Sequence, residues 1–195
     1  MASDHVHGVI FDLDGTLVHS SLDFQALMNA VKCPPGIDLL SHVNDQPEAQ
    51  RTAYLELIQH HELQDAYDAS WIEGAELFVQ QVREQGLPMA IVTRNYSDAA
   101  HLKISNNQIP IDLIITREDA PAKPDPTALL NIAKQWQLDP KHLIYVGDYL
   151  YDVQAAANAG MRSCLYVSDD LPHYSDQADI VFSCYQQLHQ RLFSD

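Results

Sequence analysis

Short apolar runs without polar alternation recur along this chain, and they constrain its fold more than any other feature. The runs GVIF, MAIV, LII, LIYV, CLYV and a weaker IVF occupy residues 8–11, 89–92, 113–115, 143–146, 164–167 and 180–182. Strands buried on both faces carry such runs, whereas strands with one solvated face alternate apolar and polar residues. We therefore expect a mostly parallel sheet with helices on both faces.

Amphipathic stretches lie between these runs and complete a repeated strand–helix pattern. One stretch stops at Gly86 and another at Gly160, a residue type that commonly follows the last residue of a helix. A third carries Leu129, Ala133 and Trp136 at helical spacing. This alternation predicts the α/β class, with an open, doubly wound, Rossmann-like sheet.

One segment breaks the alternation. About 75 residues separate the first run from the second, far more than one crossover needs. Residues 22–31 and 47–63 have helical patterns there. We divide the chain into an α/β core, residues 1–16 and 71–195, and a helical insertion, residues 17–70. Such an insertion lies at the carboxyl edge of the sheet, where these folds bind ligands, so we interpret it as a lid. A surface decoration is the alternative.

The balance of charge excludes two classes of partner. The chain has 11 Lys and Arg against 27 Asp and Glu, which gives a formal net charge of −16. Nucleic acids and anionic membranes attract clustered basic residues, so neither is expected as a partner. The three cysteines form no CxxC pair, and the first residues lack the basic region of a signal peptide. We expect a soluble, cytoplasmic protein.

The strongest chemical signal is the segment VIFDLDGTL at residues 9–17, where an apolar strand ends in two carboxylates. Asp12 and Asp14 are two positions apart, which places them on the same side of a strand. Carboxylates this close repel one another unless a cation or a shared proton separates them, and Mg²⁺ prefers such oxygen ligands. The alternative is a solvated turn, because Asp-Gly is common in turns.

Three further segments place polar groups beside later strands and helices. Thr93 directly follows the second run, just before a helix, where a hydroxyl and backbone amides can bind phosphate. Lys123 stands between prolines in PAKPDP. Asp148 comes two residues after the run LIYV, and Asp152 follows four residues later. Each segment alone has an ordinary alternative: a local cap, a solvated lysine, or acids at the start of a helix.

Together and in this order, the four segments resemble the haloacid dehalogenase superfamily of phosphohydrolases. Its four motifs match FDLDGTL, VTRN, the lysine of PAKP and GDYLYD, over about residues 9–160. The helical insertion is similar to the family's cap, which follows the first motif. Within the superfamily, the chain most resembles the phosphoglycolate phosphatase-like branch.

The resemblance implies a role for each acid. Asp12 is the nucleophile that forms an aspartyl-phosphate, and Asp14 is the general acid and base. Mg²⁺ is held by Asp12, the backbone carbonyl of Asp14 and Asp148. Asp152 lies outside these direct ligands and supports them.

The resemblance also implies a phosphate-binding set and a reaction. Thr93, Arg94 and Lys123 contact the phosphoryl oxygens, although Arg94 occupies a position that is often small in the family. Arg94 either reaches a substrate anion or pairs with Asp98. The expected function is that of a Mg²⁺-dependent phosphatase, a phosphoric monoester hydrolase acting on a small phosphorylated metabolite.

Other functions remain open at this point. A phosphomutase of the same superfamily is one alternative. A receiver-like or non-catalytic phosphate-binding module is another, although a receiver domain has no inserted lid. Asp14 favours phosphate esters, because an alkoxide leaving group needs an acid and a halide does not.

Overall fold

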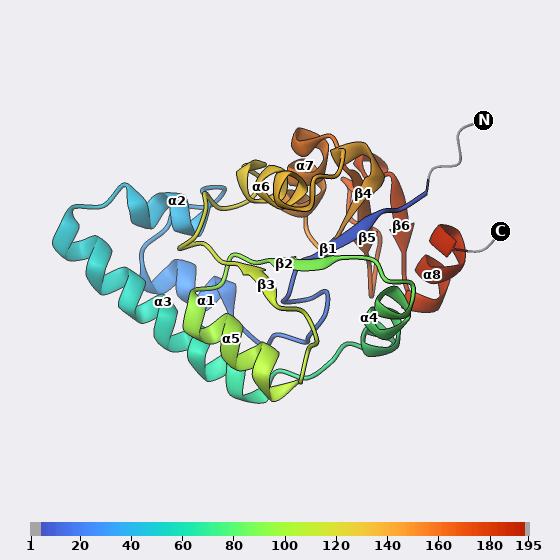
Figure 1. Cartoon of the computed structure of the whole chain (residues 1–195). Helices are drawn as coiled ribbons and strands as arrows, with labels where there is room; N and C mark the ends of the chain where they lie inside the picture. Colours follow the sequence, from blue (N-terminus) through green and yellow to red (C-terminus); the bar gives the residue numbers. More distant parts are fainter. Residues whose placement is uncertain (1–4, 194–195) are drawn as a thin grey trace.

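The computed structural model describes residues 5–193, and within them six strands form one sheet in the order β3-β2-β1-β4-β5-β6 (Figure 1). The strands are β1 (Gly8–Phe11), β2 (Met89–Val92), β3 (Leu113–Ile115), β4 (Leu143–Gly147), β5 (Arg162–Tyr166) and β6 (Ile180–Phe182). All neighbouring strands are parallel. The predicted α/β class and doubly wound sheet are confirmed.

Helices cover both faces of this sheet (Figure 1). One face carries α4 (Ala75–Glu84), α5 (Ser97–Asn106) and α8 (Tyr185–Phe193), and the other carries α6 (Thr127–Trp136) and α7 (Leu150–Ala159). In β1, Val9 and Phe11 join the first of these hydrophobic cores and Ile10 joins the second. Both faces of the strand are therefore apolar, which explains the absence of polar alternation.

The strand order reverses between β1 and β4, and this reversal positions the candidate site. Phe11 of β1 lies opposite Val146 of β4. The backbone N–H of Asp12 donates to the carbonyl of Val146 at 2.8 Å. The residues that follow the two strands, Asp12 and Asp148, therefore emerge close together at the crevice where open α/β sheets bind ligands.

The segment expected to be a helical insertion, residues 17–70, follows β1, and its three helices share a small hydrophobic core. It contains α1 (Phe24–Ala30), α2 (Leu39–Asn44) and α3 (Glu48–Asp68), coloured blue to cyan in Figure 1. The buried apolar side chains of this small core are Leu27, Val31, Leu39, Val43 and Ile58. The sequence pattern predicted α1 and α3 and missed α2. Among the described residues, no helix combines the length and apolarity that a membrane span requires.

Ion pairs join the insertion to the core, in addition to the packing of α3 along α5 (Figure 1). Within residues 5–193 the pairs that cross this boundary are Arg94–Asp38, Lys103–Asp65 and Arg117–Glu62. In each pair the core supplies the cation and the insertion supplies the carboxylate. The side chains of Arg117 and Glu62 are only 8% and 6% exposed, so this pair is largely removed from water.

Replacing Glu62 with alanine tests how firmly the insertion is held. Glu62→Ala leaves the buried Arg117 without its carboxylate, which should lower the free energy of unfolding by about 3 kcal/mol. Urea denaturation followed by circular dichroism measures the change. Glu56 lies exposed on the same helix, and Glu56→Ala should stay within about 0.5 kcal/mol of wild type. Equal stability of the two variants would contradict a structural role for the pair.

Candidate active site

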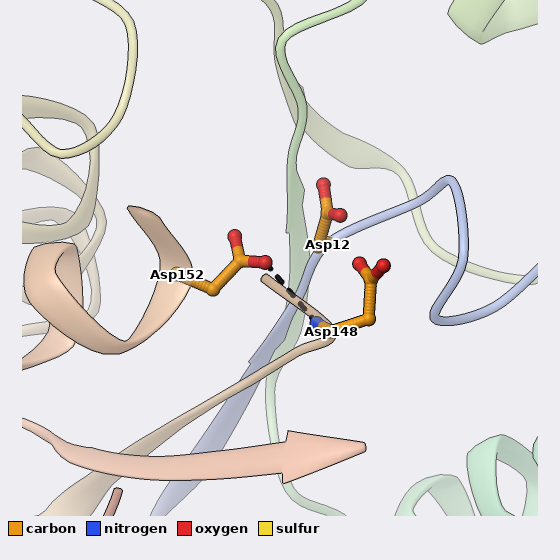
Figure 2. A group of neighbouring side chains, drawn as sticks. All are labelled: Asp12, Asp148 and Asp152. Atoms are coloured by element: carbon orange, nitrogen blue, oxygen red, sulfur yellow. Dashed lines mark hydrogen bonds between the residues drawn. The ribbon is translucent and has the colours of Figure 1, made fainter. Parts of the chain in front are cut away.

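The residues predicted from the motifs converge at the carboxyl edge of the sheet. Asp12 follows β1, Thr93 follows β2, and Asp148 follows β4. Lys123 comes from the loop before α6, and Asp152 lies in the first turn of α7. Figure 2 shows the three carboxylates of Asp12, Asp148 and Asp152 gathered around the ends of the two central strands. The fold therefore brings together residues that are up to 140 positions apart, since 152 − 12 = 140.

Lys123 is the buried cation of this group. Its Nζ donates to Oδ1 of Asp12 at 2.7 Å, to Oδ1 of Asp152 at 2.6 Å and to the hydroxyl of Tyr145 at 2.7 Å. The side chain is only 4% exposed. Burial alone lowers the pKa of Lys123, but the carboxylates of Asp12 and Asp152 outweigh it and raise the pKa above its ordinary value. The ammonium is therefore held charged beside Asp12.

The acids around Lys123 carry more negative charge than one lysine neutralises. Burial raises the pKa of Asp12 to about 6, and the attraction of Lys123 offsets this only in part. Burial likewise raises the pKa of Asp148 well above its usual value, and the charges of Asp12 and Asp152 add to the effect. A cation bound among these acids would favour their charged forms.

The donor set fits such a cation. One oxygen from each of Asp12, Asp148 and Asp152 lies within 4.8 Å of the others. Carboxylate oxygens are the ligands that hard divalent cations prefer, Mg²⁺ among them. The group therefore has the chemistry and the compactness of a metal site.

Besides its place in this donor set, Asp152 accepts hydrogen bonds that fix its neighbours. Its Oδ1 accepts from Lys123, while its Oδ2 accepts from the backbone N–H groups of Asp148 and Tyr149 at 3.1 and 3.0 Å. A Cβ at Gly147 would lie 2.3 Å from Cγ of Asp152, so the carboxyl group can fold over this turn only because residue 147 is glycine. With both oxygens engaged, Asp152 orients Lys123 and the turn that carries Asp148.

The turn after β1 is shaped to admit the carboxylate of Asp148. Gly15 has φ +72°, and a Cβ at this position would lie 2.4 Å from Oδ2 of Asp148. The neighbouring Thr16 donates from Oγ1 to Oδ1 of Asp148 at 3.1 Å. The Asp-Gly-Thr sequence thus gives both the space and a hydrogen bond for Asp148.

Asp14 is held by different partners. Its Oδ1 accepts from Nζ of Lys103 at 2.7 Å, and its Oδ2 accepts from Nδ2 of Asn95 at 2.6 Å. The motif analysis assigned no role to either partner. A signal for Lys103 was present in the sequence, because it falls at helical spacing among the buried residues Ala100 and Ile104 of α5.

Thr93 and Arg94 are adjacent in sequence but face different parts of the molecule. Thr93 is 4% exposed, and its Oγ1 accepts from the backbone N–H of Asn95 at 3.1 Å. Nη2 of Arg94 pairs with Oδ1 of Asp38 at 2.6 Å, and the Arg94 guanidinium lies 4.8 Å from the ring centre of Tyr151. Arg94 was expected either to reach a substrate anion or to pair with Asp98. The structure shows an ion pair, but its partner is Asp38 of the insertion and not Asp98.

Comparison with known proteins places this geometry in a family. The sequence model of a family described as haloacid dehalogenase-like hydrolases matches residues 25–166, which is more than half of the chain. The chain therefore belongs to the haloacid dehalogenase-like hydrolase family, as its motifs indicated.

Individual relatives define the class more closely. A haloacid dehalogenase-like hydrolase domain-containing protein of Arabidopsis thaliana is 30% identical, over 84% of this chain and 72% of that protein. A phosphoglycolate phosphatase of Cereibacter sphaeroides is 29% identical, over 95% and 97%. The crystal structure of a predicted phosphoglycolate phosphatase from Haemophilus somnus shares the fold, with a TM-score of 0.77, 18% identity and coverage of 98% and 99%. The chain is thus a phosphatase-like hydrolase related to phosphoglycolate phosphatases.

Two glycines with nearly the same φ angle test the candidate metal site. Gly15 and Gly86 have φ +72° and +71°, but a Cβ would strike Asp148 at Gly15 and meets nothing within 4 Å at Gly86. Gly15→Ala should weaken Mg²⁺ binding at least about tenfold, as is typical when the support of a metal ligand is disturbed. Gly86→Ala also introduces a side chain at a positive φ, and it should bind Mg²⁺ as wild type does. Isothermal titration calorimetry measures both, and unchanged binding by Gly15→Ala would contradict the assignment of Asp148.

Proposed function

We propose that the protein is a Mg²⁺-dependent phosphatase that hydrolyses a small phosphorylated metabolite, with an aspartyl-phosphate formed on Asp12. The observation that carries this proposal is the pairing of Asp12 with the buried Lys123 at 2.7 Å, beside Asp148 at the carboxyl edge of the sheet. Family membership and the relationship to phosphoglycolate phosphatases support a phosphorylated substrate.

The first half of the reaction uses Asp12 and Asp14. Lys123 binds one oxygen of Asp12 and so orients the carboxylate for attack on phosphorus. As the new O–P bond forms on Asp12, the ester oxygen leaves with its electron pair and receives a proton from Asp14. The protonated leaving group departs as an alcohol, and the phosphoryl group stays on Asp12.

The second half reverses the role of Asp14. A water molecule attacks the phosphorus of the aspartyl-phosphate, and Asp14 accepts the proton that the water loses. The acyl oxygen–phosphorus bond breaks, which returns the carboxylate of Asp12 and releases inorganic phosphate. Asp14 suits this work because Asn95 and Lys103 hold its carboxylate in place.

The phosphoryl oxygens need positive charge around them. Mg²⁺, held by Asp12, the backbone carbonyl of Asp14 and Asp148, would supply most of this charge. Lys123 and the end of β2 at Thr93 would bind the remaining oxygens. Arg94 could reach the substrate only by leaving Asp38, so we place it at the boundary with the insertion.

We further propose that the insertion acts as a lid over this site. Its two connections pair with each other, since Val18 and Trp71 form a β-bridge and the N–H of His19 donates to the carbonyl of Ser70 at 2.8 Å. A cavity of about 330 Å³ adjoins the site, and its lining includes Gly15, Asp148 and much of the segment 166–174 from the core, together with His19 and Ser20 of the first connection. A lid at this position would exclude bulk water and contact the leaving group.

Phosphate release from p-nitrophenyl phosphate and a panel of metabolite phosphates tests the function. Wild type should release phosphate with Mg²⁺ and lose this activity in EDTA. Asp12→Asn should lower kcat at least about 10³-fold, because an amide is a poor nucleophile. Asp112 is exposed and outside the site, and Asp112→Asn should retain wild-type activity. More than a tenth of wild-type activity in Asp12→Asn would overturn the covalent mechanism.

The identity of the leaving group distinguishes the role of Asp14. Nitrophenolate leaves with little help from an acid, whereas an alkoxide needs a proton. Asp14→Asn should therefore slow the phosphorylation step at least about tenfold more on an alkyl phosphate than on p-nitrophenyl phosphate. Single-turnover kinetics measure that step separately, and an equal loss on both esters would count against Asp14 as the acid.

A further inference from the structure

Lys103 is a second buried lysine beside the catalytic motifs, and it holds the carboxylate of Asp14 together with a carboxylate of the insertion. Its side chain is 0% exposed. Its Nζ lies 2.7 Å from Oδ1 of Asp14 and 2.7 Å from Oδ2 of Asp65. Lys103 belongs to α5 of the core, whereas Asp65 belongs to α3 of the insertion. One ammonium group therefore joins the proposed acid to the insertion.

The two carboxylates are what make this burial possible. An ammonium removed from water is costly unless charged partners surround it. Burial alone lowers the pKa of Lys103, but Asp14 and Asp65 outweigh it and raise the pKa above its ordinary value. Lys103 therefore stays charged, and its position is set by both acids together.

Asp65 is itself fixed to the connection that leads out of the first motif. Its Oδ1 accepts from the backbone N–H of Ser21 at 2.6 Å, and its Oδ2 accepts from Oγ of Ser20 at 2.7 Å. The counterion of Lys103 is thus tied to the base of the insertion. A shift of α3 away from the core would withdraw Asp65 from Lys103.

The other partner of Asp14 does not make this link. Asn95 follows β2 in the core and holds Oδ2 of Asp14 at 2.6 Å. Of these two partners, Lys103 is the one that also binds a residue of the insertion. The orientation of the Asp14 carboxylate therefore depends on Lys103, and the position of Lys103 depends on Asp65 of the insertion.

We propose that Lys103 is a positioning residue that orients Asp14 for proton transfer, and that Asp65 makes this orientation depend on the docking of the insertion. The inference rests on the proposed phosphatase function. A displacement of about 1 Å in a catalytic group can cost about a hundredfold in rate, so a lost hydrogen bond at Oδ1 of Asp14 is sufficient to matter. When the insertion docks on the core, Asp65 positions Lys103, and Lys103 in turn aligns Asp14.

A merely structural role for Lys103 makes a different prediction. General damage to the site slows every substrate to a similar degree. Misalignment of the acid slows esters with poor leaving groups and largely spares those with good ones. The informative quantity is the ratio of kcat/KM for p-nitrophenyl phosphate to kcat/KM for the alkyl phosphate that wild type hydrolyses fastest.

The test compares Lys103→Met, Asp65→Asn and the double variant with wild type. Lys103→Met should raise the ratio at least about tenfold, which is part of the roughly 10²- to 10⁴-fold that a general acid contributes. Asp65→Asn should raise it about threefold, and the double variant should not exceed Lys103→Met, because residues that act through one contact are not additive. Lys134→Met and Asp68→Asn, at exposed positions of α6 and α3, are the matched controls and should leave the ratio unchanged.

The outcomes separate this inference from the function on which it rests. Equal loss on both esters in Lys103→Met would overturn the positioning role, and additive changes in the double variant would overturn the link through Asp65. If circular dichroism shows that Lys103→Met does not fold, Asp65→Asn decides, and an unchanged ratio there overturns the inference. Wild type that hydrolyses neither ester would refute the proposed function and the inference with it. Active wild type with unchanged ratios would refute the inference alone.

Discussion

The contact of Lys123 with Asp12 and Asp152 is the interaction on which the carboxyl edge of the sheet depends. Two neighbouring strands each deliver a carboxylate to this edge, and a third comes from the helix that follows β4. Without a buried ammonium, these acids would have to take up protons or move apart. Lys123 offsets part of this repulsion, and a cation bound among the three carboxylates would offset more of it.

The sheet and most of the site could be predicted because one physical rule covers both. A parallel sheet buried on both faces needs unbroken apolar runs, and all of its strands end at the same edge. Polar residues directly after such runs are therefore neighbours in space even when they are far apart in sequence. Asp12, Thr93 and Asp148 follow this rule. Lys123 does not directly follow a strand, and it was identified from its place in the order of the four motifs.

The remaining features depend on contacts that local patterns do not encode. Lys103 and Asp65 are 38 residues apart on two helices that meet only in the folded chain. Tyr145 lies in the apolar run LIYV, which gives no sign of a polar role, yet its hydroxyl accepts a hydrogen bond from Nζ of Lys123 at 2.7 Å. The helix α2 has six residues and starts at an N-cap, Asp38, whose side chain accepts from the N–H of Ser41. A helix this short has too few residues for a clear periodic signal.

In the ion pairs that the described residues form between core and insertion, the core supplies every cation, which limits the positive charge that is left for an anionic substrate. Arg94, Lys103 and Arg117 of the core are each paired with a carboxylate of the insertion. The arrangement holds the insertion down but engages these cations before any substrate arrives. A phosphate group must then find its positive charge elsewhere, at Lys123, at backbone amides and at a bound cation. In a chain of net charge −16, the proposed function therefore locates the attraction for phosphate at Lys123 and a bound cation, and it leaves to the proposed lid the selection among leaving groups.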